Sequence, residues 1–224
     1  MSLLLTIETT TKNCSVALFD DAKQLALKEL VSEGYSHAEQ LTIFIEEVLS
    51  EVKISINNLN AIALSMGPGS YTGLRIGTST AKGLCYSLGI PLIAISTLKA
   101  MALGISKKYD FPLYCPMIGA RRMEVFAGMY DSENNEIREV NADVVDVNTY
   151  AEYLKNEVLF FGDGALKCAD IISNDNANFI ECYPSAKDIR ILAFQKYSNN
   201  DFEDVAYFEP YYLKDFVASI QKKA

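Results

Sequence analysis

A glycine-dense segment between an apolar run and a helix-like stretch limits what this chain can fold into more than any other feature. It reads Ser65-Met-Gly-Pro-Gly-Ser-Tyr-Thr-Gly-Leu-Arg-Ile-Gly77. Glycine permits positive φ and lets another backbone or a phosphate group come close. A glycine-rich turn between a strand and a helix often binds phosphate, but it is also a place where two elements pack tightly. Both interpretations are carried forward.

Short strands open the chain. Polar turns separate three strand-like runs, Leu3–Glu8, Cys14–Phe19 and Gln24–Val31, which predicts an antiparallel meander. A helix follows, because Ser36 and Glu39 have capping-box spacing and apolar residues then recur at helical intervals.

Strands and helices alternate after this meander. Ala61–Met66 is continuously apolar, as a buried parallel strand would be. The glycine loop leads into a helix over Thr72–Leu88, which Gly89 ends. Pro91–Ile95 reads as a strand, and Thr97 is placed to cap the next helix. This order predicts a mixed sheet and matches the ribonuclease-H-like unit that the actin, hexokinase and heat-shock ATPase superfamily carries twice.

The second half repeats the order in a weaker form. Its predicted elements are strands at Leu113–Ile118, Met123–Tyr130, Ile137–Val147 and Val158–Phe161, a short helix at Tyr150–Lys155, a helix after Gly162-Asp-Gly164, and a helix from Ser185 to Tyr197. We therefore predict a two-lobed α/β fold of the actin-like type whose second lobe is degenerate. The predicted lobes are residues 1–110 and 111–224.

Composition narrows the choice of partners. The 224 residues hold 20 Lys and Arg against 29 Asp and Glu, a formal charge of −9, and no basic block stands out. We therefore do not expect this chain to bind RNA by itself, because phosphate contacts supply much of the affinity of proteins for RNA. The five cysteines form no C-x-x-C pair, and no apolar run approaches the ~20 residues that span a bilayer. We expect a cytoplasmic protein with no membrane attachment.

The glycine loop is not a P-loop. Leu74 and Arg75 follow Gly73, where a P-loop has Lys and then Ser or Thr. Phosphate binding through backbone amides remains open. Glu8 ends the first strand, where a carboxylate could hold a hydrated Mg²⁺ beside a phosphate. Asp163, between two glycines in the second half, could face the same cleft, and the alternative is that it is an ordinary turn aspartate. The candidate nucleotide-binding residues are Glu8, Thr9, Gly67, Gly69 and Asp163.

Small residues form a stripe on the helix that follows the loop. Gly73, Gly77, Ala81 and Cys85 stand four residues apart and share one helix face. Glycine inside a helix costs about 1 kcal/mol relative to alanine, so close approach of another element is the simplest compensation. That element is either internal or the helix of a partner.

His37 is the single histidine of the chain. Without a second histidine or a cysteine pair, no metal site is expected, and His37 reads most simply as a surface or capping residue. The turn Gly119-Ala-Arg-Arg122 is a compact basic segment, which is explained either by surface ion pairs or by an anion or partner contact.

These residues together resemble one family, TsaB, also called YeaZ. The segments that carry the resemblance are Leu5-Thr-Ile-Glu-Thr-Thr-Thr, Cys14-Ser-Val-Ala-Leu, Ser36-His-Ala-Glu, Gly67-Pro-Gly-Ser-Tyr-Thr-Gly-Leu-Arg-Ile-Gly and, more faintly, Ala120-Arg-Arg-Met-Glu-Val-Phe, Gly162-Asp-Gly and Pro210-Tyr-Tyr-Leu-Lys. The resemblance covers nearly the whole chain. Family members often show Asp at the position of Glu8, and Asp-Ala-Arg where this chain has Gly119-Ala-Arg. The second change weakens a nucleotide or metal role there.

The resemblance implies a role in making the threonylcarbamoyl modification of the adenosine beside the tRNA anticodon. In that pathway a TsaD-like protein carries the catalytic metal on a pair of histidines, and a TsaE-like ATPase joins the assembly. This chain would be the non-catalytic partner subunit, with no catalytic residue, no required cofactor and only indirect contact with tRNA. ATP or ADP with Mg²⁺ would bind only within the complex. The alternative is a stand-alone nucleotide-binding ATPase of the actin-like superfamily.

We expect the partner to bind through the helix Thr72–Leu88 and its neighbour, and the same surface to close a homodimer when the chain is alone. The expected interface residues are Ser70, Tyr71, Thr72, Gly73, Arg75, Ile76, Gly77, Thr80, Ala81, His37 and Leu41. A bulky residue at Gly77 is expected to block pairing without unfolding the chain.

Overall fold

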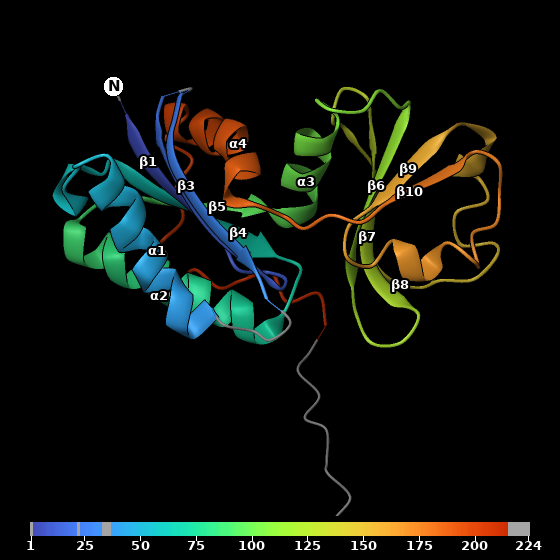
Figure 1. Ribbon diagram of the computed structural model, residues 1–224, viewed down its shortest axis with the longest axis horizontal. Helices are drawn as coiled ribbons and strands as arrows, with labels where there is room; N and C mark the ends of the chain where they lie inside the picture. Colours follow the sequence, from blue (N-terminus) through green and yellow to red (C-terminus); the bar gives the residue numbers. More distant parts are fainter. Residues whose placement is uncertain (1, 22, 33–36, 215–224) are drawn as a thin grey trace, which may run out of the picture.

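Two five-stranded sheets lie side by side with a helix between them, as the computed structural model of residues 2–21, 23–32 and 37–214 shows (Figure 1). The α-helices are α1 (His37–Glu51), α2 (Tyr71–Leu88), α3 (Thr97–Ile105) and α4 (Ala186–Ser198). The strands are β1 (Leu3–Glu8), β2 (Asn13–Asp20), β3 (Lys23–Val31), β4 (Ala61–Gly67), β5 (Leu92–Ser96), β6 (Leu113–Gly119), β7 (Glu124–Asp131), β8 (Glu136–Val144), β9 (Val158–Phe161) and β10 (Ala177–Ile180). Three short 3₁₀ turns cover Ile56–Asn58, Tyr153–Lys155 and Leu166–Cys168.

The two sheets share one topology. The first has the order β3-β2-β1-β4-β5, and the second has the order β10-β9-β6-β7-β8. In each, an antiparallel meander of three strands is extended by two parallel strands from its first member. This repetition confirms the predicted two-lobed actin-like fold. The second lobe is degenerate because 3₁₀ turns occupy the places where crossover helices are expected.

Apolar side chains on both faces explain why the first sheet is sandwiched between helices. Leu5 and Ile7 of β1 belong to the core beneath α1 and α2, whereas Leu4 belongs to the core on the opposite face with Ile189 of α4. Successive strand residues point to opposite faces, so a continuously buried strand needs a cover on each side.

Helix α3 joins the lobes. Ala100 packs in the core of the first lobe, and Leu98 and Met101 pack with Tyr114 and Phe161 of the second sheet. Figure 1 shows α3 between the two sheets and beside α4. Because α3 packs in the cores of both lobes, this short helix holds the two lobes in position relative to each other.

Helix α4 returns the chain to the first lobe. The Asn13 side-chain amide donates to the Pro184 carbonyl at 2.9 Å, and the Thr6 hydroxyl donates to the Ala186 carbonyl at 2.8 Å. Ser185 caps the helix by accepting a hydrogen bond from the Lys187 amide, as its sequence position predicts. The second sheet lies within residues 111–224, but α4 of the same range packs on the first sheet. Chain order alone does not reveal this return.

The segment from Glu203 to Tyr212 also runs along the first lobe. The Glu203 amide donates to the Leu92 carbonyl at 2.9 Å, and the Tyr211 amide donates to the Met66 carbonyl at 2.7 Å. Between them, the Lys82 ammonium of α2 donates to the carbonyls of Ala206 at 3.2 Å and Phe208 at 2.8 Å. We call residues 203–212 the C-terminal strap.

Several local predictions were wrong. Ser96, not Thr97, caps α3 through the Lys99 amide, because Thr97 instead accepts a hydrogen bond from the Gly67 amide at 3.1 Å. The helices predicted at 150–155 and after Gly164 shorten to 3₁₀ turns. Strand β10 was missed because its four half-buried residues carry little pattern and are held by backbone pairing to β9. The predicted cap Ser36 lies outside the described residues.

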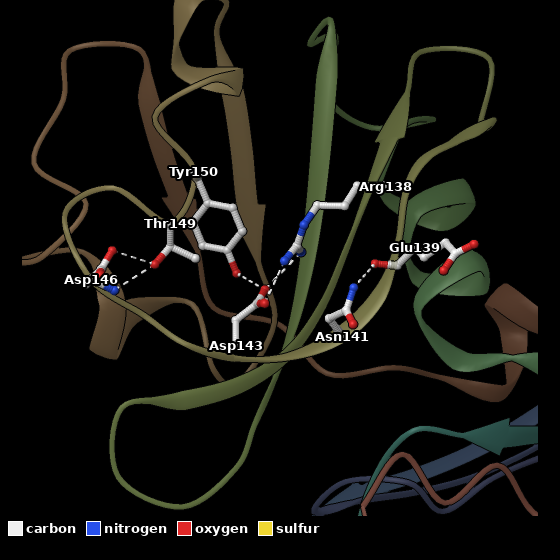
Figure 2. A network of polar contacts seen from close by, with 7 residues as sticks. All are labelled: Arg138, Glu139, Asn141, Asp143, Asp146, Thr149 and Tyr150. Carbon is white, nitrogen blue, oxygen red and sulfur yellow. Dashed lines mark hydrogen bonds and ion pairs between the residues drawn. The ribbon is translucent and has the colours of Figure 1, made fainter.

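A buried ion pair anchors the edge of the second lobe (Figure 2). The Arg138 guanidinium donates to both carboxylate oxygens of Asp143, at 2.6 and 2.9 Å, and the Tyr150 hydroxyl donates to the same carboxylate at 2.7 Å. Asp143 is only 9 % exposed. The three side chains tie β8 to the loop that follows it.

We expect Asp143→Ala to lower the free energy of unfolding by about 3 kcal/mol, because it leaves the Arg138 charge and the Tyr150 hydroxyl without their partner. Urea unfolding measures this loss. Asp146→Ala is the matched control, since its exposed carboxylate accepts hydrogen bonds from the nearby Asn148 and Thr149, and its loss should cost clearly less than the loss of Asp143. Equal losses in the two variants would contradict a structural role for the buried pair.

Candidate functional site

The glycine loop uses its backbone amides inside the chain. The Gly67 amide donates to Thr97, the Ser70 amide to the Thr10 carbonyl at 2.7 Å, and the Gly73 amide to the Ser70 hydroxyl at 3.3 Å. A Cβ at Gly69 would lie 2.5 Å from the Thr10 carbonyl oxygen, so the loop is pressed against the turn after β1. These three amides are therefore engaged within the chain.

The small-residue stripe of α2 also faces inward. A Cβ at Gly73 would overlap the Thr9 carbonyl oxygen, and one at Gly77 would overlap the Thr9 hydroxyl oxygen. The Thr9 hydroxyl donates to the Gly73 carbonyl at 2.8 Å. Ala81 and Cys85 continue the stripe and are fully buried. Of the two alternatives that the sequence left open, the internal contact is the one that the structure shows.

Five residues expected at the interface are therefore corrected. Gly73, Gly77, Ala81, His37 and Leu41 are buried within the chain and present no surface to a partner. A bulky residue at Gly77 would act first on the fold, contrary to the expectation from sequence. The small-residue stripe correctly predicted that another element comes close to α2. Helix periodicity does not reveal whether that element belongs to the same chain or to a partner.

His37 is a structural residue rather than a surface one. It begins α1, has no exposed surface, and its Nε2 donates to the Thr11 carbonyl at 2.7 Å. Burial lowers the pKa of its imidazole, partly offset by this hydrogen bond. The neutral ring thus fixes the same turn after β1 that Gly73 and Gly69 contact.

The remaining interface candidates keep part or all of their surface accessible. Thr72 and Arg75 are exposed, and Ser70, Tyr71, Ile76 and Thr80 are half-buried. The outward stripe of the helix consists of Thr72, Arg75, Ser79, Gly83 and Tyr86, spaced three and four residues apart. Arg75 lies 4.8 Å from the centre of the Tyr71 ring, which in turn packs on Tyr212 of the C-terminal strap at 5.1 Å.

Two exposed tyrosines extend this surface and were missed from sequence. Tyr86 is 85 % exposed and Tyr207 is 83 % exposed. Tyr86 lies one helical turn after Lys82, whose ammonium holds the backbone on both sides of Tyr207. The sequence could have signalled Tyr86 only as a large aromatic residue on the helix side away from the small-residue stripe. It offered no signal for Tyr207, whose position depends on the strap.

A shallow apolar groove separates α1 from α2. It has a volume of about 370 Å³ and is lined by Ile45 and Leu49 of α1, Ile54 and Ile56 after it, and Thr80 and Leu84 of α2, together with Thr42, Glu46 and Ser50. Thr80 is thus the one predicted interface residue that faces this groove.

Glu8 is enclosed beneath the turn after β1. It is 1 % exposed and accepts hydrogen bonds from the Thr10 amide at 2.6 Å, the Thr10 hydroxyl at 2.5 Å and the Ser65 hydroxyl. Burial raises the pKa of its carboxyl, and the hydrogen bonds from Ser65 and Thr10 oppose that rise. A carboxylate so occupied does not offer a ligand to a hydrated Mg²⁺.

A cleft of about 620 Å³ lies between the lobes. The turn after β1 and the start of α2 form one wall, and residues 118–121 with Asp163 form the other. Asp163 accepts a hydrogen bond from the Gly119 amide at 2.8 Å, and burial raises its pKa while that bond opposes the rise. Lys214 crosses the cleft edge to pair with Glu124.

The predicted nucleotide-binding residues do not come together in this cleft. Gly69 and Asp163 line it, whereas Glu8, Thr9 and Gly67 are buried behind its wall. Among the described residues, no group of three or more His, Cys, Asp and Glu side chains is arranged to hold a metal ion. Glu8 and Asp163 therefore do not line the cleft together.

Comparison with known proteins places the chain in a family. Residues 32–222 match the model of the family described as "TsaD: tRNA N6-adenosine threonylcarbamoyltransferase". The tRNA threonylcarbamoyladenosine biosynthesis protein TsaB of Escherichia coli (strain K12) is 30% identical over 223 residues, which are 96% of this chain and 96% of that protein. The chain belongs to the TsaB family. The TsaB of Buchnera aphidicola subsp. Schizaphis graminum (strain Sg) is 31% identical over 88% of this chain and 95% of its own.

The fold comparison agrees with this membership. The structure of YeaZ from Pseudomonas aeruginosa superposes with a TM-score of 0.81 at 24% identity and covers 95% of this chain and 100% of that one. TsaB-family architecture thus extends over both lobes. Over the described ranges, no helix combines the length and the apolar character that crossing a membrane requires.

We expect Gly73→Ala to lower the free energy of unfolding by about 2 kcal/mol, because the added methyl group meets the Thr9 carbonyl. Gly83→Ala in the same helix is the matched control, since no atom lies within 4 Å of its Cβ position. This control should raise the free energy of unfolding by up to about 1 kcal/mol. Thermal unfolding of both variants measures the difference, and a neutral Gly73→Ala would contradict the internal contact.

Glu8→Gln is expected to flatten the pH dependence of stability. Because the folded pKa of Glu8 is raised, the folded chain binds its proton more tightly than the unfolded chain does. The free energy of unfolding should therefore fall as pH rises from about 4.5 through the folded pKa, and the variant should lack this loss. Urea titrations at a series of pH values measure it. Parallel pH curves for the two proteins would contradict burial of an ionisable Glu8.

Proposed function

We propose that the chain is a non-catalytic partner subunit in tRNA threonylcarbamoyladenosine biosynthesis and that it pairs with a TsaD-like transferase. The observation that carries this proposal is family membership over nearly the full length, combined with a match of residues 32–222 to the TsaD family model. Family resemblance implies that the transferase holds its metal on two histidines. Here the single histidine is committed to the Thr11 carbonyl.

The outward side of α2 and the C-terminal strap form the proposed partner surface. Tyrosine and arginine are enriched at the centres of protein interfaces, and here Arg75 and Tyr86 are exposed on α2, while Tyr207 is exposed on the strap that Lys82 holds to this helix. The α1–α2 groove adjoins this surface through Thr80. Ser70, Tyr71, Thr72 and Ile76 complete the candidates retained from the sequence prediction.

The wider assembly follows from the same assignment. A TsaE-like ATPase joins the pair, and ATP or ADP with Mg²⁺ belongs to the complex rather than to this chain alone. When the transferase is absent, the same α2 surface closes a homodimer, since a self-complementary patch forms two-fold pairs. All five cysteines are free thiols and four are buried, which suits a reducing cytoplasm.

We expect Tyr86→Ala to weaken pairing with a TsaD-like protein at least about tenfold, because an aromatic side chain central to an interface contributes more than 1 kcal/mol. Arg75→Glu should have an effect of similar size. Calorimetric titration against the purified transferase measures the affinity, and light scattering of the isolated variants reports loss of the homodimer.

Tyr109→Ala is the matched control, because Tyr109 is partly exposed on a different surface, after α3. Its affinity should equal that of the wild type. Unchanged affinity of both α2 variants would contradict the proposed surface. Failure of the wild-type chain to associate with any TsaD-like protein would contradict the proposed function itself.

A further inference from the structure

A second concave site lies at the junction of α3 and α4, away from the partner surface and the interlobe cleft. Its volume is about 300 Å³, and its walls include Lys107 and Lys108 after α3, and Lys187 and Arg190 of α4. Figure 1 shows the two helices side by side. We propose that this pocket binds a phosphate group of the RNA backbone, an inference that rests on the proposed function in tRNA modification.

The charge balance of the pocket is unlike that of the chain. Four cationic side chains and one carboxylate, Asp188, line it, whereas the chain as a whole carries −9. The cations come from two segments that are distant in sequence, which is why the sequence shows no basic block. Lys and Arg contacts to phosphates supply much of the affinity of proteins for nucleic acids.

Carboxylates neutralise only part of the charge of the three pocket lysines. Lys187 pairs with Glu29 at 3.1 Å, but among the described residues no carboxylate lies within ion-pair distance of Lys107 or Lys108. Burial lowers the pKa of Lys107, and the nearby Arg190 lowers it further. Repulsion between neighbouring cations is relieved when an anion binds between them.

Asp188 is the one carboxylate that lines the pocket. It lies in the first turn of α4, and its carboxylate packs on Gly104, where a Cβ would come within 2.6 Å of Oδ1. Burial raises its pKa to about 6, against the pull of Lys187, Lys108 and Lys107. Near neutral pH this carboxylate is mostly ionised and opposes an incoming phosphate.

The size of the pocket indicates what it accommodates. A volume of about 300 Å³ is at the lower limit of small-molecule sites. A lining that brings four cations together beside apolar residues such as Phe19 and Leu103 suits one phosphate of a larger polyanion, whose remaining parts lie outside the pocket. The pocket would therefore add a direct tRNA contact, where the sequence led us to expect only an indirect one.

The test compares two double variants of the full chain. K107E/K108E reverses two pocket charges, and K53E/K155E reverses two exposed lysines that do not line the pocket, so both lower the net charge by the same amount. Fluorescence anisotropy with an unmodified tRNA transcript measures affinity over a range of salt concentrations. We expect the pocket variant to bind about tenfold more weakly, with a salt slope reduced by about 0.7–0.9 for each lost phosphate contact. The control should stay within about twofold of the wild type.

Asp188→Asn should change affinity in the opposite direction, with about threefold tighter tRNA binding, because it removes the one carboxylate that lines the pocket at little change in shape. A parallel titration with inorganic phosphate distinguishes binding of an RNA phosphate from binding of free phosphate. Phosphate binding that is lost in K107E/K108E while tRNA affinity is unchanged would overturn the RNA assignment.

Two results would overturn the pocket as an RNA site. One is that the wild type shows no salt-dependent tRNA binding, and the other is that the two lysine variants lose tRNA affinity equally. Association with the TsaD-like protein is measured on the same variants. Because the pocket lies away from α2, pairing should be unchanged in all of them. Loss of pairing in the wild type would instead refute the proposed function and leave the tRNA measurement to stand independently.

Discussion

The close approach of α2 to the turn after β1 is the contact on which much of the first lobe depends. Thr9 lies against Gly73 and Gly77, and its hydroxyl donates to the Gly73 carbonyl. His37 and the Ser70 amide hold the carbonyls of the next two residues of that turn. No larger side chain fits between these backbones, so the glycines fix the depth at which the helix sits on the sheet.

This packing also changes the chemistry of the lobe. The turn after β1 and the glycine loop line the interlobe cleft, and several of their amides are bonded within the chain: Thr10 to the Glu8 carboxylate, Gly67 to Thr97 and Gly73 to Ser70. Burial raises the pKa of Glu8, and its two carboxylate oxygens accept hydrogen bonds from Thr10 and Ser65. Helix α2 consequently keeps one side fully inside and presents Arg75 and Tyr86 outside. The fold serves best as a rigid support for a partner surface.

The C-terminal residues complete that support. Helix α4 covers the otherwise bare face of the first sheet, and the strap places Tyr207 and Tyr212 beside α2. The same return brings Lys187 and Arg190 next to Lys107 and Lys108, which forms a basic pocket in an acidic protein. One late segment thus contributes to both surfaces for which we propose a function.

Local pattern determined much of the architecture by itself. Apolar runs between polar turns predict the strands, helical spacing and capping residues predict α1, α2 and α4, and the order of elements predicts two repeated lobes, because these signals depend on neighbours close in the sequence. The family motif was equally local. Tertiary structure alone decided that the glycine stripe faces Thr9, that His37 is buried and that α4 packs on the first lobe. It also decided that four separate cations share one pocket. Each of these outcomes depends on contacts between segments far apart in sequence, and periodicity within one segment cannot specify its partner.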